Sequence, residues 1–580
     1  MWPRAWLAVA LLLAGGNAHA LELVLDPAGL AVDQQERAHE LLEQVKLRLP
    51  APWLADPRAL TLRFDPRLPR HVAGRRRRDG QLLLAPSLLQ AAGPATEHEL
   101  AQATVVHEIA HAFDRGKGGG WSRQAAFRRL AGWDRRGGNP YALRSPDGYE
   151  RHSPAEAFAV NLEWYLLDPQ YRCRRPALAA WYRQQLGPAA LPPVACTDAL
   201  PLLVAGADAA QQQLALERLD PARVYAVDYL LAGTGDAAMS QFGHAMLRLV
   251  VCAPEHAPGP QCRMDLAYHR VLSFRAFVND VQISNWRGLT GAYPARLFVL
   301  PLDQVIDEYT RIELRELQSW PLALSAAQVR SLLQAAARAH WTYDGRYRFI
   351  GNNCAVESGR LLDLALTPER QRLQAITPRG VLRRLQQAGL AAAQLPSMRS
   401  EDGFQFASAR EDYRHLLLGL QQARLAPSMS LEDWLESSVQ QRGELPSNLP
   451  LQPTAAWWVL ETAALRRAEL RAMAQLKRQL RQDPAGLQAR VADWQRFSGL
   501  VDAPAALLPD SGYGIVQPEE LDALELALDR HGAEAGQRWQ ALREAAEQAL
   551  PVARRQELER TRQRVQWLAA RMRQLAAAAE

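Results

Sequence analysis

The strand and helix signals of this chain change character twice, and those two changes limit its fold more than any other feature. Short strand patterns at 60–64 and 81–86 alternate with helical patterns up to about residue 200. Alternating apolar residues then predict mainly strands over 222–300, and after residue 400 the Ala-, Leu-, Arg-, Glu- and Gln-rich chain predicts helices. We therefore expect an α+β protein with three parts: a mixed domain (21–200), a strand-rich domain (201–395) and an all-α C-terminal region (396–580).

Breaks in the secondary-structure pattern predict where the domains and the last helices begin and end. A Pro-rich segment at 192–201 precedes an Ala- and Gln-rich pattern at 206–218, for which we predict a helix. The last two helices are predicted at 518–531 and 534–578, with Pro551 inside the second.

The first twenty residues have the features of a secretory signal peptide. Arg4 supplies the positive charge, a short apolar run follows, and Ala18-His19-Ala20 resembles a cleavage site. No later stretch reaches about 18 uninterrupted apolar residues, the length that predicts a transmembrane helix. We expect a mature chain in the periplasm of a bacterium, or secreted from it.

The net charge is too small to indicate a nucleic-acid partner. It is +6 for the whole chain, and +5 once Arg4 leaves with the signal peptide. Four consecutive arginines at 75–78 precede the turn signal Asp79-Gly80, so we predict a solvated hairpin tip there. The alternative is a peripheral contact with anionic membrane headgroups.

Five cysteines in an exported chain leave at least one thiol unpaired. Cys252 and Cys262 flank a Pro- and Gly-rich loop, and Cys173 and Cys196 flank a short helical pattern. If these two pairs form disulfides, Cys354 is the free cysteine.

The segment TVVHEIAHAF carries an H-E-x-x-H pattern. On a helix, His107 and His111 lie on one face and can bind one metal ion, while Glu108 can polarise a bound water as a general base. Zinc needs a third protein ligand and an open fourth position for catalysis. The extended metzincin pattern is absent. Downstream candidates for the third ligand are Glu156, Glu150, His152 and Glu163.

The segment DGYERHSPAEAFAVNLEWY resembles the third-ligand helix of gluzincins of the lethal-factor type. That resemblance implies a zincin-like first domain with Zn²⁺ held by His107, His111 and Glu156. It also implies that Tyr149, seven residues before Glu156, stabilises an oxyanion.

A second candidate site lies in the strand-rich domain. His244 begins an apolar strand pattern, and Cys354 opens a helical pattern after Asn352-Asn353. A thiol at a helix N-terminus is stabilised as a thiolate by the helix dipole, and a nearby histidine can take its proton. Such a pair suits acyl transfer through a thioester.

The order of His before Cys is that of permuted papain-like (NlpC-type) enzymes. More closely, the segments MSQFGHAMLRL, DLAYHRVLSF and YDGRYRFIGNNCAVESGRLLDL resemble the Lnb N-terminal periplasmic domain family, named for a bacterial lipoprotein N-acyltransferase. The resemblance covers residues 222–370 and implies Cys354 as nucleophile and His244 as base. It implies an orienting polar group on the next strand, His269 first and Asp265 second.

These patterns support three hypotheses about function. The first is a cell-envelope thiol acyltransferase or hydrolase, acting on a lipid, lipoprotein or peptide substrate and preceded by a zinc-binding domain. The second is a periplasmic zinc metallopeptidase whose Cys/His domain recognises the substrate. The third is a non-enzymatic envelope scaffold.

Overall fold

The computed structural model describes residues 20–578, apart from 78, 91–94, 115–119, 135–137, 142, 146, 206–213, 236–240, 277–292, 367–371, 395–403, 483–504, 506–507, 509–511 and 549. The predicted signal peptide at 1–20 therefore lies almost wholly outside the described residues. The chain forms two compact units. The first takes in 1–138 and 147–196, and the second takes in 139–146 and 197–580.

A four-stranded sheet organises the first unit. Its order is β1 (Glu22–Asp26), β2 (Ala59–Phe64), β4 (Leu82–Leu84) and β3 (Gly74–Arg76). The first three strands are parallel, and β3 is an antiparallel edge strand joined to β4 by a hairpin. The predicted hairpin at the arginine run is therefore confirmed for the residues described, with Arg75 and Arg76 inside β3.

Helices cover this sheet and carry the predicted H-E-x-x-H segment. The two that matter for the site are α3 (Ala95–Asp114) and α5 (Pro154–Leu167), which pack on each other. The helix α7 (Pro176–Leu186) follows, and a disulfide joins Cys173 to Cys196. The other helical segments of this unit are α1 (Val32–Lys46), α2 (Ala51–Leu54), α4 (Ala125–Ala131), α6 (Tyr171–Arg174), η1 (Pro86–Leu89), η2 (Trp121–Arg123) and η3 (Gly148–Arg151).

A larger sheet organises the second unit, and nearly all its neighbouring strands are antiparallel. The strand β12 pairs with β10 off the main path, and β5 joins β10 in parallel. In sheet order the strands are β13 (Phe404–Phe406), β11 (Leu317–Pro321), β7 (Val224–Ala232), β8 (His244–Val251), β9 (Arg270–Ala276), β10 (Tyr293–Pro301), β5 (Leu200–Ala205) and β6 (Leu214–Leu219), with β12 at Gly345–Tyr347.

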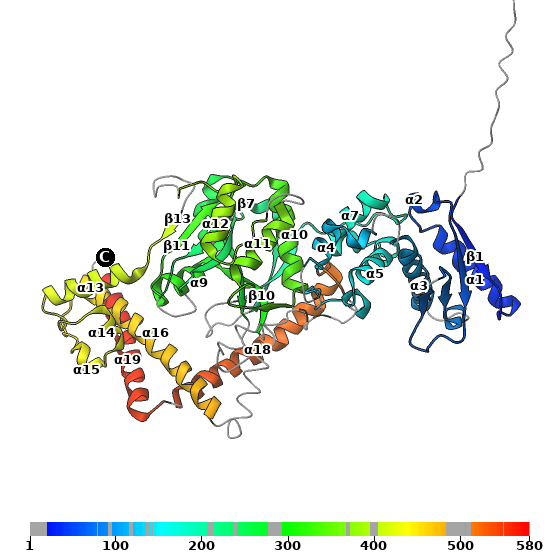
Figure 1. The fold of residues 1–580 in the computed structure, drawn as a ribbon. Helices are drawn as coiled ribbons and strands as arrows, with labels where there is room; N and C mark the ends of the chain where they lie inside the picture. The colour runs from blue at the N-terminus through cyan, green and yellow to red at the C-terminus, as the bar shows by residue number, and fades with distance from the viewer. Residues whose placement is uncertain are drawn as a thin grey trace, which may run out of the picture. The chain divides into compact units, whose positions relative to one another are not determined.

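Two sets of helices cover the two faces of this sheet. One face packs on α10 (Ala326–Thr342), α11 (Cys354–Leu366) and α12 (Pro378–Gln387), which lie together in Figure 1. The other packs on α9 (Leu302–Ile306) and the π-helical turn η7 (Asp307–Ile312). A disulfide joins Cys252 to Cys262 between β8 and η5 (Pro260–Met264), and the remaining turns are η4 (Pro221–Arg223) and η6 (Leu266–Tyr268).

The predicted helix at 206–218 is wrong where the structure describes it. Residues 214–219 form β6, which pairs antiparallel with β5 along its whole length, and 206–213 lie outside the described residues. Leu, Ala and Glu are good helix formers, but intrinsic propensities differ by less than about 1 kcal/mol per residue between ordinary residues. The hydrogen bonds and packing offered by a neighbouring strand therefore decide the conformation here.

Long helices form the C-terminal part of the second unit. Trp434 and Trp457 are fully buried among them, with their ring centroids 4.9 Å apart, so both side chains belong to the helical core. The helices are α13 (Ala409–Gln422), α14 (Leu431–Glu436), α15 (Val439–Arg442), α16 (Leu451–Gln482), α18 (Pro518–Gln548) and α19 (Val552–Ala577).

The predicted break between the last two helices is displaced. The break lies at Pro551, the residue that precedes α19, and not at 532–533. Proline lacks an N–H and clashes with the preceding turn, so it begins a helix more readily than it continues one. Gly532, by contrast, costs only about 1 kcal/mol inside a helix and is tolerated.

Candidate metal centre and thiol site

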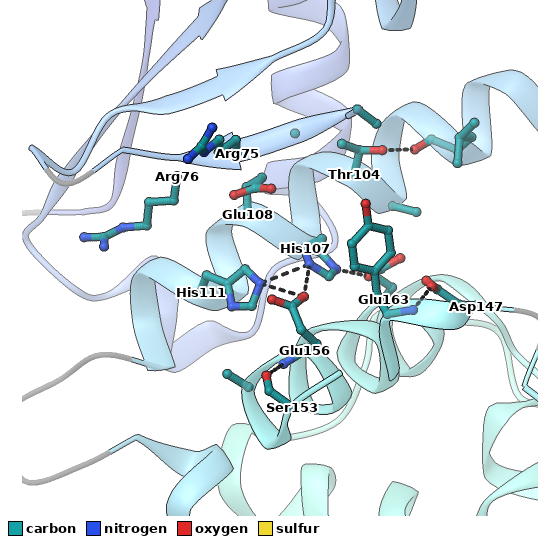
Figure 2. Close-up of a pocket in the computed structure, with 16 residues that line it drawn as sticks. Arg75, Arg76, Thr104, His107, Glu108, His111, Asp147, Ser153, Glu156 and Glu163 are labelled. Carbon is teal, nitrogen blue, oxygen red and sulfur yellow. Dashed lines mark hydrogen bonds and ion pairs between the residues drawn. The ribbon is translucent and has the colours of Figure 1, made fainter. Parts of the chain in front are cut away.

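Three predicted ligands converge in the first unit. The Nε2 atoms of His107 and His111 lie 3.0 Å apart, and the Glu156 Oε2 lies 3.0 Å from the first and 3.2 Å from the second. Figure 2 shows the three side chains pointing toward one another from α3 and α5. Tetrahedral zinc with bonds of about 2.0–2.1 Å places its ligand atoms about 3.3 Å apart, so this donor set and its spacing fit zinc.

Local sequence explains why Glu156 reaches the histidines. Ser153 caps α5, its hydroxyl accepting a hydrogen bond from the Glu156 N–H at 3.1 Å, and Pro154 occupies the first helical position. Both residues favour the start of a helix, and they place Glu156 in the first turn. On α3, the i, i+4 spacing of His107 and His111 places both imidazoles on the same face of the helix.

Charge coupling between these groups is strong. Burial disfavours the charged forms, yet hydrogen bonds with Glu156 and Glu163 raise the pKa of His107 to about 10. Burial likewise opposes ionisation of Glu156, but its hydrogen bonds to His107 and His111 hold its pKa well below the usual range. Without metal, the cluster therefore keeps a proton on His107 at neutral pH.

Glu163 contacts His107 on the side of the ring opposite Glu156. Its Oε1 lies 2.5 Å from the Nδ1 of His107, the ring nitrogen that faces away from Glu156. A carboxylate in this position fixes the tautomer and orientation of a metal-binding histidine. Glu163 therefore orients His107, although the sequence also made it a candidate ligand.

The other two candidate ligands lie elsewhere. Glu150 is buried and bonded to Arg175 and Asn161. His152 packs its ring on that of Tyr149 at 5.4 Å and is exposed. Neither residue lines the cavity that contains the converging side chains.

Glu108 and Tyr149 line that cavity, whose volume is about 480 Å³. Burial raises the pKa of Glu108, although the charges of His107 and His111 act to lower it. The Arg76 N–H of β3 donates a hydrogen bond to the Glu108 carboxylate. Tyr149 is half-exposed, with its ring 6.2 Å from that of His107.

Gly74 lets the edge strand pass close to Glu108. A Cβ atom at Gly74 would lie 2.8 Å from both the Cγ and the Oε1 of Glu108. A side chain at this position would therefore displace either the strand or the carboxylate.

Cys354 is free and buried in the second unit, and both predicted disulfides are present. It opens α11, where the Asn353 side chain accepts hydrogen bonds from the N–H groups of Ala355 and Val356. Burial raises the pKa of the thiol, outweighing hydrogen bonds from the Ala245 N–H and the Tyr347 hydroxyl.

The structure does not bring His244 into hydrogen bonding with Cys354. Alternate residues of β8 face opposite sides of the sheet. Ala245 lies in the core that contains Cys354, whereas His244 pairs with Ala232 on the face that contains Met246 and η7.

Ser273 of β9 is the hydrogen-bond partner of His244, at 3.0 Å from its Nε2. The ring packs on that of Tyr309. Burial, together with the charges of Arg275 and Arg315, lowers the pKa of His244 to about 3. His244 is therefore neutral at physiological pH.

The two residues predicted to orient His244 lie elsewhere. His269 is fully buried, with its Nδ1 2.9 Å from Arg248 and its Nε2 2.8 Å from the Cys262 carbonyl oxygen. Asp265 accepts a hydrogen bond from the Ala253 N–H and contacts His256. The structure instead places Ser273 in that position. A lone serine within the apolar strand segment VLSF (271–274) was the available sequence signal.

In the described part of the chain, no helix is both long enough and apolar enough to cross a membrane.

We predict that zinc binding to the first unit releases about one proton at neutral pH. Zinc requires a neutral imidazole, whereas the raised pKa of His107 keeps that ring protonated up to about pH 10. The apparent affinity should therefore fall about tenfold for each pH unit below neutrality. Calorimetry in buffers of different ionisation enthalpy measures the proton count. Binding that is independent of pH would contradict this charge coupling.

We predict that the native protein exposes no rapidly reacting thiol. Cys354 is 4% exposed and its pKa is raised, so both access and thiolate content are low. Mass spectrometry after a short incubation with iodoacetamide should find Cys354 unmodified in buffer and modified in urea, with the other four cysteines protected until reduction. Rapid native labelling of Cys354 would show an accessible thiolate instead.

Comparison with known families bears on both units. Residues 210–388 match the Lnb N-terminal periplasmic domain, which agrees with the resemblance identified at 222–370. Residues 119–193 match a domain of unknown function, DUF7844, a range that contains Tyr149 and Glu156 but neither histidine of the cluster. Neither match identifies a zinc peptidase, so the zincin-like domain stays a prediction. Comparison with curated proteins and with solved structures found no match. The match to a periplasmic domain, together with the two disulfides of the chain, supports an extracytoplasmic location.

Proposed function

We propose that this chain is a cell-envelope protein whose first unit is a zinc-dependent hydrolase of peptide or related amide bonds. The observation that carries the proposal is the convergence of His107, His111 and Glu156 at 3.0–3.2 Å on the wall of a cavity that also contains Glu108. Three protein ligands leave one position open, as catalytic zinc sites require.

Each residue has a role that follows from its place. Zinc held by the three ligands would polarise the substrate carbonyl and lower the pKa of a water molecule. Glu108, buried beside the ligands, accepts the proton of the attacking water and later donates it to the leaving amine. The raised pKa of Glu108 moves this carboxyl toward the pH range in which it both accepts and donates a proton.

Two further groups complete the proposed site. The Tyr149 hydroxyl would donate a hydrogen bond to the oxygen that gains negative charge in the transition state. The edge strand β3 passes beside Glu108, where its backbone can pair with an extended substrate. An extended peptide is therefore the substrate shape that this cavity favours.

We predict that Glu108→Gln keeps zinc and loses hydrolysis. A glutamine preserves the shape of the site but cannot take a proton, so the turnover rate should fall by about 10² to 10⁴. Metal analysis and cleavage of a quenched fluorescent peptide library by the full-length mature protein give the two readouts. His111→Ala should lose both zinc and activity.

Glu99→Gln is the matched control, because Glu99 lies on the same helix and is exposed. It should retain both zinc and activity. A zinc-free wild-type protein, or a fully active Glu108→Gln variant, would contradict the proposed hydrolase.

A second candidate function is favoured by the match to the Lnb domain over 210–388. In it, the Cys354 thiol attacks an ester of an envelope lipid or lipoprotein, the alcohol leaves with a proton, and the acyl group stays on sulphur as a thioester. An amine or water would then accept the acyl group. For His244 to take the thiol proton, its ring has to leave Ser273 and reach the Cys354 side of the sheet.

We predict that this second activity leaves an acyl group on Cys354. The protein is incubated with p-nitrophenyl palmitate in detergent, and the acylated peptide is identified by mass spectrometry. Wild type should carry the adduct, Cys354→Ser should lack the thioester, and His244→Ala should form it about 10² to 10⁴ times more slowly. An unmodified wild-type protein, or equal rates with and without His244, would exclude the pair.

A further inference from the structure

Two isoleucines near the N-terminus of α11 have exposed side chains that lie outside the core. Ile350 is 70% exposed and Ile376 is 61% exposed, among the highest values for large apolar side chains in the described part of the chain. They come from separate segments, but the Asn353 side chain ties the segments together by donating to the carbonyl oxygens of Phe349 (3.1 Å) and Ile376 (2.9 Å).

The backbone explains why these side chains point outward. Arg348 and Asn352 pair across a tight turn, and Gly351 adopts a positive φ of 98° that allows the turn to close. Ile350 occupies the tip of this turn. Ile376 directly precedes Thr377, which caps α12 through a hydrogen bond from the Gly380 N–H at 3.1 Å. Both positions are therefore fixed by neighbouring hydrogen bonds rather than by burial of the isoleucines.

Arginines surround the two isoleucines. Arg346 and Arg348 are exposed on the same hairpin as Ile350. On α12, Val381 and Leu385 pack into the core, which leaves Arg379 and Arg383 exposed. Among the residues that the structure describes, none of these four guanidinium groups forms an ion pair.

We propose that this surface docks on an anionic phospholipid bilayer. The docking surface comprises Ile350, Ile376, Arg346, Arg348 and Arg379. A peripheral membrane protein presents exposed apolar side chains that enter the headgroup region. Basic residues around them attract anionic lipids. Protein partners favour a different surface, with large aromatic anchors in a closely packed patch. Unpaired guanidinium groups match the charge of the lipid phosphates.

This inference goes beyond the zinc hydrolase and does not depend on it. Docking would place the N-terminus of α11, and with it Cys354, next to the lipid surface. The thiol site and the bilayer would then face each other without any transmembrane helix.

The test is flotation of the full-length mature protein with vesicles. The vesicles contain either phosphatidylcholine alone or equal parts of phosphatidylcholine and phosphatidylglycerol. Wild type should bind the anionic vesicles, and added salt should weaken binding. Each positive charge removed should lower partitioning about fivefold, so Arg346→Ser/Arg348→Ser should lower it about 25-fold. Ile350→Ser/Ile376→Ser should lower it about tenfold or more.

Matched control pairs come from the C-terminal helices of the same unit. Arg555→Ser/Arg560→Ser removes the same charge from exposed positions, and Leu418→Ser/Leu526→Ser removes exposed apolar side chains. Both control pairs should bind like wild type, and circular dichroism should be unchanged in all variants. The proposal is overturned if wild type does not float with anionic vesicles, if the control pairs lose as much binding as the docking-surface pairs, or if an envelope protein rather than lipid retains the chain through Ile350 and Ile376.

Discussion

The contact of Glu156 with His107 and His111 is the interaction on which the function proposed for the first unit depends. It brings a carboxylate and two imidazoles from two helices to 3.0–3.2 Å. Burying such groups is costly unless they are paired with one another or with a metal ion. Glu163 behind His107 and the close approach of β3 to Glu108 at Gly74 serve the same cluster. A structural role alone would not require an open cavity of about 480 Å³ beside it.

Strand alternation decides which side chains meet in the second unit. Because neighbouring residues of β8 face opposite sides of the sheet, Ala245 meets Cys354 while His244 meets Ser273. The nucleophile and base proposed for acyl transfer thus come from the same end of the sheet but from different faces. Any such reaction needs a rearrangement at the start of β8, and a bound lipid surface is a candidate to favour it.

The fold was predictable where a local pattern was strong. The H-E-x-x-H helix, the Ser-Pro start of α5 and both disulfides followed from short-range spacing, which local backbone preference and chain proximity control. The strand β6 and the break at Pro551 were mispredicted, because pairing with β5 and the tolerance of Gly532 outweighed local propensity. Ser273 and the positions of His269 and Asp265 were missed for another reason. Which polar residue meets His244 depends on register between strands, and a single sequence does not reveal register.

X-ray absorption at the zinc edge, on the full-length mature protein, tests whether the first unit holds zinc through two imidazole ligands and one carboxylate. We predict one zinc per chain with two imidazole nitrogens and a carboxylate oxygen, all at about 2.0–2.2 Å, and a spectrum that changes in Glu156→Ala. Zinc ligated by sulphur, a spectrum unchanged in Glu156→Ala, or a chain that binds no zinc would contradict it.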